Sequence, residues 1–179
     1  RIHKLLPRHA TGGDRNTMDK VKKVAIIGAG RLGTSLARAV AGTQLEVLLL
    51  EQSEERAAIV PLKIERMLDK DIAKWRLTET EKKLIQERIR VSTDLNEVKT
   101  AHLVIEAIPE DFELKETLLR RLDEICPPEV VFITTTAALS ITKLASKLSR
   151  PEKLIGVNIQ IPVILIPIME VVSGLKTSE

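Results

Sequence analysis

Aromatic residues are almost absent from this sequence of 179 residues. Trp75, Phe112 and Phe132 are the only ones, and there is no tyrosine. A hydrophobic core must therefore be built from aliphatic side chains. The length suits one domain of ordinary size and is sufficient to bury such a core.

Cysteine is equally scarce, with Cys126 as the only one. A single cysteine excludes an internal disulfide and is compatible with a reducing compartment, so we expect a cytoplasmic protein. Cys126 precedes Pro127 and Pro128 at an expected helix end, and no base that could activate a nucleophile lies nearby. We interpret Cys126 as a structural residue.

Long apolar runs are missing too. None reaches the roughly 18 residues of a membrane-spanning helix, and residues 1–17 lack the continuous apolar centre of a secretory signal. The chain begins at Arg1, whereas Met18 opens a plausible natural start. We expect residues 1–17 to be a disordered tail or an expression remnant, residues 18–179 to form the domain, and no membrane partner.

Neither positive nor negative charge is in excess within the expected domain. The formal net charge of +3 comes entirely from residues 1–20, and the remaining residues are balanced. This balance gives little support to nucleic-acid binding. No cluster of His, Cys and carboxylate residues has metal-ligand spacing, so we expect no metal site.

A glycine-rich turn between two apolar runs is the most informative feature that is present. Residues 24–27 form the first run and residues 45–50 the second, with a helical apolar pattern between them. Three glycines with GxGxxG spacing join the first run to the helix: Gly28, Gly30 and Gly33. This order matches the dinucleotide-binding fingerprint, although a GxGxxG turn alone also fits a purely structural role.

In that fingerprint the first glycine makes the tight turn, the second lets the backbone approach a pyrophosphate, and the third lets helix and strand pack closely. Arg31 and Leu32, between the second and third glycines, are expected beside the cofactor. Glu51 ends the second run and would accept hydrogen bonds from the adenine ribose. Because Gln52 and Ser53 bring no positive charge, we predict NAD rather than NADP, with Gln52 also near it.

Residues 52–89 exceed an ordinary crossover and predict a helical arm inserted after the second strand. Ser53 begins one helix, which Pro61 should interrupt or kink, and Thr78 begins a second helix. Strands and helices then alternate, which predicts an α/β fold with a Rossmann-type, doubly wound, mostly parallel sheet.

Further strands are expected at residues 90–92, 103–106, 130–134, 154–157 and 168–172. The helix over residues 111–125 should bury four leucines: Leu114, Leu118, Leu119 and Leu122. Ser140 should begin a helix that reaches Leu148. In sheets of this type ligands bind beyond the carboxyl ends of the strands.

Five segments are specific enough to point to a family: VAIIGAGRLG, WRLTETE, LVIEAIPEDFELKETLLRRLDEICPP, LSITKLASKLSRPEKLIGVN and MEVVSGLKTSE. Through them the chain resembles, from about Lys22 to Glu179, the N-terminal NAD-binding domain of 3-hydroxyacyl-CoA dehydrogenases, and 3-hydroxybutyryl-CoA dehydrogenases in particular. The resemblance implies that Ile108, Glu110 and Lys115 lie near the nicotinamide half of NAD, and Thr135 beside the cofactor. For Glu110 and Lys115, an exposed helix start with an ordinary ion pair is equally compatible.

The catalytic positions are where the sequence departs from that family. The family has S-N-T-S-S-L after the fifth strand and H-F-F-N-P at the next strand end, where this chain has TTTAAL and NIQIP. In the family the histidine is the general base, a glutamate matched by Glu170 orients it, and the serine matched by Ala137 contacts the substrate oxygen. Asn158 stands at the histidine position, and its amide cannot accept a proton near neutral pH. Glu170 should then lack the partner that gives it a role.

Two hypotheses of function follow. In the first, the chain is the NAD-binding domain of a 3-hydroxyacyl-CoA dehydrogenase whose C-terminal substrate and dimerisation domain is absent, so that acyl-CoA binds only with a completing domain and turnover is negligible. In the second, it is a non-catalytic NAD-binding module for sensing or assembly. An apolar segment could pair it with another copy or a partner chain: Ile159, Ile161, Val163, Ile164, Leu165 and Ile166.

Overall fold

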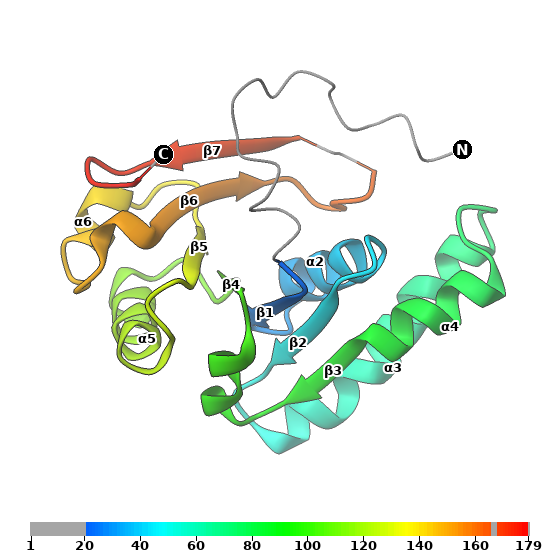
Figure 1. Ribbon diagram of the computed structural model, residues 1–179. Helices are drawn as coiled ribbons and strands as arrows, with labels where there is room; N and C mark the ends of the chain where they lie inside the picture. Colours follow the sequence, from blue (N-terminus) through cyan, green and yellow to red (C-terminus); the bar gives the residue numbers. More distant parts are fainter. Residues whose placement is uncertain (1–20, 166–167, 179) are drawn as a thin grey trace.

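A computed structural model describes residues 21–165 and 168–178 of the chain, which form a sheet covered by helices on both faces (Figure 1). The seven strands lie in the order β3-β2-β1-β4-β5-β6-β7. Their bounds are β1 (Lys23–Ile27), β2 (Glu46–Leu50), β3 (Ile89–Ser92), β4 (Leu103–Glu106), β5 (Val131–Thr135), β6 (Leu154–Ile159) and β7 (Met169–Ser173). Strands β1 to β6 are parallel, and β7 runs antiparallel to β6. The predicted Rossmann-type sheet is therefore confirmed.

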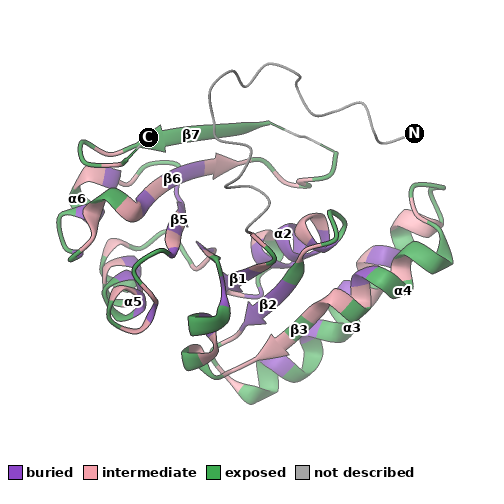
Figure 2. Cartoon of the chain, in the orientation of Figure 1, coloured by how far each residue is buried: buried purple, intermediate pink, exposed green. Residues whose placement is uncertain are grey.

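Residues of the central strands alternate between two aliphatic cores, one on each face of the sheet. Ala25 and Ile27 of β1 belong to one core, and Val24 and Ile26 belong to the other. Parallel strands covered on both faces are apolar throughout, because neither face is solvated. This explains why β1 and β2 are continuous apolar runs, and Figure 2 shows them as buried.

Three helices cover one face and two cover the other (Figure 1). The first face carries α2 (Arg31–Ala41), α3 (Glu54–Ile72) and α4 (Glu79–Arg88), and the second carries α5 (Phe112–Ile125) and α6 (Ile141–Ala145). The predicted arm is the pair α3 and α4. Its second helix begins with a capping box, in which Thr78 and Glu81 satisfy each other's backbone N–H groups.

Two local predictions were wrong, and one alternative of a third is excluded. Pro61 does not interrupt α3, which is one helix with that proline inside it. The helix that Ser140 caps ends at Ala145, so Leu148 lies in the following turn. Leu114 is 53% exposed, because it lies on the side of α5 that faces the carboxyl edge of the sheet rather than the core.

The connections that leave the carboxyl ends of β1, β4 and β5 meet at one edge of the sheet. The chain passes from β1 to β2 on one side and places β4 on the other side of β1, which opens a crevice at this point. None of the helices within residues 21–165 and 168–178 is long and apolar enough to cross a membrane. Predictions for residues 1–17 and for Ile166 lie outside the described residues.

Candidate cofactor site

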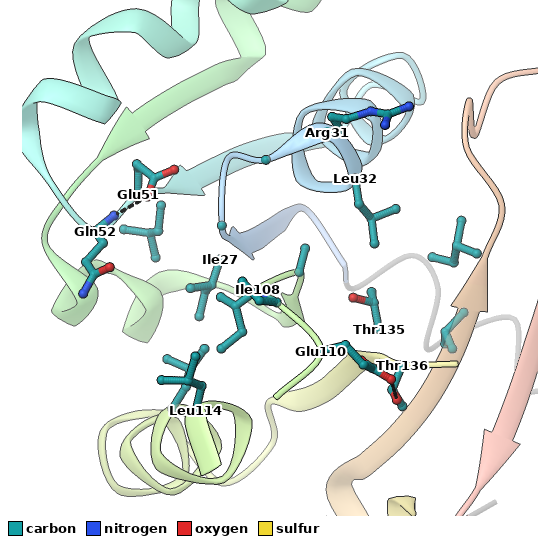
Figure 3. A pocket seen from close by; sticks show the side chains of 18 of the residues that line it. Ile27, Arg31, Leu32, Glu51, Gln52, Ile108, Glu110, Leu114, Thr135 and Thr136 are labelled. Atoms are coloured by element: carbon teal, nitrogen blue, oxygen red, sulfur yellow. Dashed lines mark hydrogen bonds between the residues drawn. The ribbon is translucent and has the colours of Figure 1, made fainter. Parts of the chain in front are cut away.

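A cavity of about 920 Å³ lies along the carboxyl edge of the sheet, where the crevice opens. Glu51 and Gln52 lie at one end of it, and Glu110, Thr135 and Thr136 lie at the other (Figure 3). Leu114 and Ile108 contribute apolar walls between these ends. Its lining therefore comes from the carboxyl ends of the strands and the segments that follow β1 to β5, with the end of β6 closing one side.

The three glycines of the turn have different surroundings. Gly28 has a φ of +100°, and a Cβ there would lie 2.8 Å from the carbonyl oxygen of Ala107. A Cβ on Gly33 would lie 1.8 Å from the carbonyl oxygen of Gly28, so the start of α2 can approach β1 only without a side chain. Gly30 has nothing within 4 Å of its Cβ position and borders the cavity.

The same turn leaves the first N–H groups of α2 without a side-chain cap, since Gly30 is the N-cap residue and makes no side-chain hydrogen bond. Free N–H groups and the helix dipole favour an anion at this position. Arg31 and Leu32 of the first turn also line the cavity, and Arg31 is exposed. The open space at Gly30 and these donors fit the pyrophosphate of a dinucleotide.

Glu51 lies at the carboxyl end of β2, as the sequence predicts for a ribose ligand, and it lines the cavity with Gln52. Its Oε1 atom accepts a hydrogen bond of 2.8 Å from the N–H group of Gln52 (Figure 3). Arg56 also lines this end, with its Nη1 atom 4.0 Å from Oε1 of Glu51. The sequence analysis missed Arg56, because the residue comes near Glu51 only when the chain turns into the first turn of α3.

Lys115 is fully buried below the loops that follow β4 and β5, so the alternative of an exposed helix start is wrong for this residue. It is not among the residues that line the cavity, and its place near the nicotinamide half of NAD stays a prediction. Its Nζ atom donates hydrogen bonds to Oε1 of Glu106 at 2.6 Å, to the carbonyl of Thr135 at 3.0 Å and to the carbonyl of Ile108 at 3.4 Å. Three acceptors thus match the three donors of the ammonium group.

Glu106 is the buried partner that the sequence analysis missed. Its carboxylate also accepts hydrogen bonds from the N–H group of Ile108 and the hydroxyl of Thr134. Burial raises the pKa of Glu106, and the ammonium of Lys115 and these donors oppose that shift. The signal that could have predicted this partner is the carboxylate at the end of the apolar strand LVIE, because a buried carboxylate requires a buried partner.

Glu110 lies at the predicted end of the cavity, but its carboxylate holds a loop. It accepts hydrogen bonds from the hydroxyl of Thr136 and from the N–H groups of Ala137 at 3.1 Å and Ala138 at 3.2 Å. Lys115 lies 3.7 Å from its other oxygen. Burial opposes ionisation, but these donors and the ammonium outweigh it and lower the pKa of Glu110.

Asn158 and Ala137 line the same end of the cavity. Nδ2 of Asn158 donates a hydrogen bond of 3.4 Å to Oε2 of Glu170, so Glu170 contacts an amide and not the histidine that gives it a role in the family. The antiparallel pairing of β6 and β7 places the two residues opposite each other. Glu170 itself is exposed and does not line the cavity.

Two residues that could carry chemistry lie outside the cavity. His102 precedes β4 at the opposite edge of the sheet and accepts a hydrogen bond from the N–H group of Lys23. Cys126 ends α5 and is buried, which raises the pKa of its thiol to about 11 and leaves it unreactive. Residues 21–165 and 168–178 contain no group of three or more His, Cys, Asp or Glu residues that could hold a metal ion.

The parallel sheet, the glycine turn and the cavity at the strand crossover define a dinucleotide-binding domain of the Rossmann class. Comparison with known families then gives the particular one. The chain belongs to the 3-hydroxyacyl-CoA dehydrogenase family, because the family model for the NAD binding domain of these enzymes matches residues 23–179. NAD is therefore the cofactor of this domain.

The relatives are longer proteins. The chain is 34% identical over 160 residues to a probable 3-hydroxybutyryl-CoA dehydrogenase of Bacillus subtilis, covering 89% of this chain and 56% of that protein. It is 35% identical over 162 residues to a 3-hydroxyadipyl-CoA dehydrogenase of Escherichia coli, covering 90% and 34%. The crystal structure of (S)-3-hydroxybutyryl-CoA dehydrogenase from Ralstonia eutropha matches with a TM-score of 0.86 and 34% identity, covering 89% and 56%.

Proposed function

We propose that this chain supplies the NAD-binding part of an oxidoreductase for 3-hydroxyacyl-CoA, and that it has little or no turnover by itself. The main support is the cavity, whose lining extends from Glu51 to Asn158 along the carboxyl edge of the sheet. Relatives named as dehydrogenases of 3-hydroxybutyryl-CoA and 3-hydroxyadipyl-CoA support the substrate class. Because the chain spans one third to just over half of these relatives, acyl-CoA would bind only with a completing domain.

In this proposal Gly28 and Gly30 hold the pyrophosphate and Glu51 holds the adenine ribose. Bound NAD accepts a hydride during oxidation of an alcohol. The loops that carry Ile108, Glu110 and Thr135 line the nicotinamide half. Lys115 supports these loops from the buried side of the cavity wall, because its ammonium donates hydrogen bonds to the carbonyls of Ile108 and Thr135 rather than to the cofactor.

The low turnover follows from the residues at the catalytic end of the cavity. Alcohol oxidation needs a base, and the amide of Asn158 cannot accept a proton near neutral pH. Glu170 accepts a hydrogen bond from that amide, so this carboxylate orients a group without basic function. Ala137 presents a methyl group where a hydroxyl could contact the substrate oxygen.

Restoring both residues tests this account. We expect Ala137→Ser with Asn158→His, in this chain fused to the substrate domain of a relative, to oxidise 3-hydroxybutyryl-CoA, measured as NADH absorbance. A general base contributes about 10²–10⁴-fold to the rate, so the double variant should exceed the unsubstituted fusion by about that factor. Asn158→Gln is the matched control and should remain inactive. An inactive double variant that still binds NADH would contradict the assignment of these positions.

A second candidate is a non-catalytic NAD-binding module that pairs with another copy or a partner chain. Of the predicted apolar segment, Ile164 and Leu165 are exposed, whereas Ile159, Ile161 and Val163 are half-buried. The supporting observation is that exposed apolar side chains continue onto β7 and the residue before it: Ile168, Met169, Val171 and Val172. Figure 2 shows β7 exposed along its length. Exposed apolar side chains on an edge strand favour association, and within the described residues β7 pairs with β6 alone.

Sedimentation of the purified chain tests this candidate. We expect the native chain to associate in a concentration-dependent manner, and Val171→Lys to remain monomeric because the charge cannot be buried at an interface. Lys63→Gln, on the exposed side of α3, is a control that should behave as the native chain. A monomeric native chain at all concentrations would exclude self-association.

We also propose a cytoplasmic location, since Cys126 is a free thiol.

A further inference from the structure

Arg56 stands at the adenine-ribose end of the cavity in a position that helix stability does not explain. It lies in the first turn of α3, lines the cavity, and has a side chain that is 68% exposed. Glu54 and Glu55 in the same turn suit the positive end of the helix dipole, whereas a cation there is unfavourable. The position of Arg56 is therefore better explained by contact with a ligand than by helix stability.

Glu51 is the acidic group that lies next to Arg56. The distance from Nη1 of Arg56 to Oε1 of Glu51 is 4.0 Å, and a pair as exposed as this contributes little to stability. The N–H group of Gln52 holds the same Oε1 atom at 2.8 Å. The carboxylate is thus fixed by the backbone, while the guanidinium beside it remains largely free in solvent.

Other charges do not reach this end of the cavity. The carboxylate of Glu54 accepts a hydrogen bond from the hydroxyl of Thr93 and does not line the cavity. The remaining charged residues of the lining are Arg31, at the glycine turn, and Glu110, at the opposite end. Within the described residues, one anion and one cation therefore decide the electrostatics where the adenine ribose would bind.

We propose that Glu51 and Arg56 set cofactor selectivity as a pair. In the native chain Glu51 accepts hydrogen bonds from the ribose diol, repels a 2′-phosphate and offsets the charge of Arg56. Once the charge of Glu51 is removed, Arg56 binds a 2′-phosphate, because a guanidinium offers several N–H donors in a geometry that suits phosphate oxygens. This inference rests on the proposed binding of the adenine ribose by Glu51.

A double-mutant cycle with binding as the readout tests the inference. The native chain, Glu51→Ser, Arg56→Gln and the double variant are titrated with NADH and NADPH by cofactor fluorescence. Glu51→Ser should weaken NADH binding and strengthen NADPH binding about tenfold or more, and Arg56→Gln in that background should abolish the gain. Calorimetric titration with 2′,5′-ADP and 5′-AMP should show the same dependence on Arg56 without the nicotinamide half.

Two controls separate this role from general charge effects. Arg31→Gln in the Glu51→Ser background should weaken both cofactors alike, because Arg31 lies at the turn where the pyrophosphate binds in either cofactor. Lys63→Gln removes the same charge from an exposed position on α3 outside the cavity, and it should change neither affinity. Thermal unfolding of each variant tests whether the fold is retained, and a melting temperature close to that of the native chain is expected.

Arg56→Glu in the native background gives a second measurement that leaves Glu51 intact. It should lower the ratio of NADPH to NADH affinity, because a second carboxylate beside Glu51 repels a 2′-phosphate. A gain in NADPH affinity that persists without Arg56, together with an unchanged ratio in Arg56→Glu, would overturn the inference. Failure of the native chain to bind NADH would instead overturn the cofactor role on which it depends.

Discussion

The three glycines of the GxGxxG motif differ in what surrounds their Cβ positions. Gly33 has a backbone oxygen 1.8 Å from its Cβ position, and Gly28 combines a positive φ with a close approach to Ala107. Both are therefore required by the fold, whether or not a cofactor is bound. Gly30 has an ordinary extended conformation, with a φ of −73°, and open space where a Cβ would be. The sequence predicts the motif, but only the structure distinguishes these tasks.

The single residue Glu110 should make the stability of the folded chain depend on pH. Its pKa in the folded chain lies below the ordinary value of 4.5, so its ionised form stabilises the fold above that pH. This contribution is lost as the pH falls through the lowered pKa. We expect Glu110→Gln to reduce the melting temperature near neutral pH, and the difference from the native chain to shrink below about pH 4.

Thermal unfolding between pH 3 and pH 7 measures this difference, and Glu113→Gln is the control. Glu113 is an exposed neighbour in the first turn of α5 and makes no ion pair within the described residues. A difference between Glu110→Gln and the native chain that stays constant across this range would contradict the assigned hydrogen bonds.

The strands, helix starts and arm could be predicted from sequence because their signals are local. Apolar runs predict the strands, and Ser53, Thr78 and Ser140 each cap the helix that they were expected to begin. Contacts that depend on how elements pack could not be predicted. Spacing alone did not show that Lys115 turns inward to Glu106, or that α3 contains Pro61 without a break.

The pair of Glu106 and Lys115 joins β4, β5 and α5, so its loss should destabilise the contacts among these three elements. Both side chains are fully buried. Removing one partner leaves a buried charge, so Glu106→Gln should reduce the free energy of unfolding by about 3–5 kcal/mol. Glu106→Gln combined with Lys115→Met should recover most of that loss, since no buried charge remains.

Urea unfolding of the native chain, both single variants and the double variant measures this coupling. Additive losses in the double variant would show that the two side chains do not depend on each other. The same network holds the loops of Ile108 and Thr135, so a loosened edge of the sheet should also weaken NADH binding.

For the whole molecule, the sequence predicted residues that line the cavity near the glycine turn, but it did not predict the contacts at the other end of the cavity. Strand, glycine turn, helix and Glu51 lie within one short segment, so their arrangement follows from local structure. The other end of the cavity gathers Glu110 and Ala137 from two loops and Asn158 from β6. The rule that ligands bind at the carboxyl ends of the strands pointed to these segments, and only family resemblance gave the residues their roles. Neither argument predicted that Asn158 contacts Glu170.

The most direct measurement is a titration of the purified chain with NADH, comparing the native chain with Gly30→Ala. We expect saturable binding by the native chain and about tenfold or weaker binding by Gly30→Ala, with an unchanged melting temperature, because a methyl group would enter the cavity and not the core. Gly33→Ala should instead lower the melting temperature, since its methyl group meets backbone. No saturable binding by the native chain, or equal affinity in Gly30→Ala, would contradict a dinucleotide site at this turn.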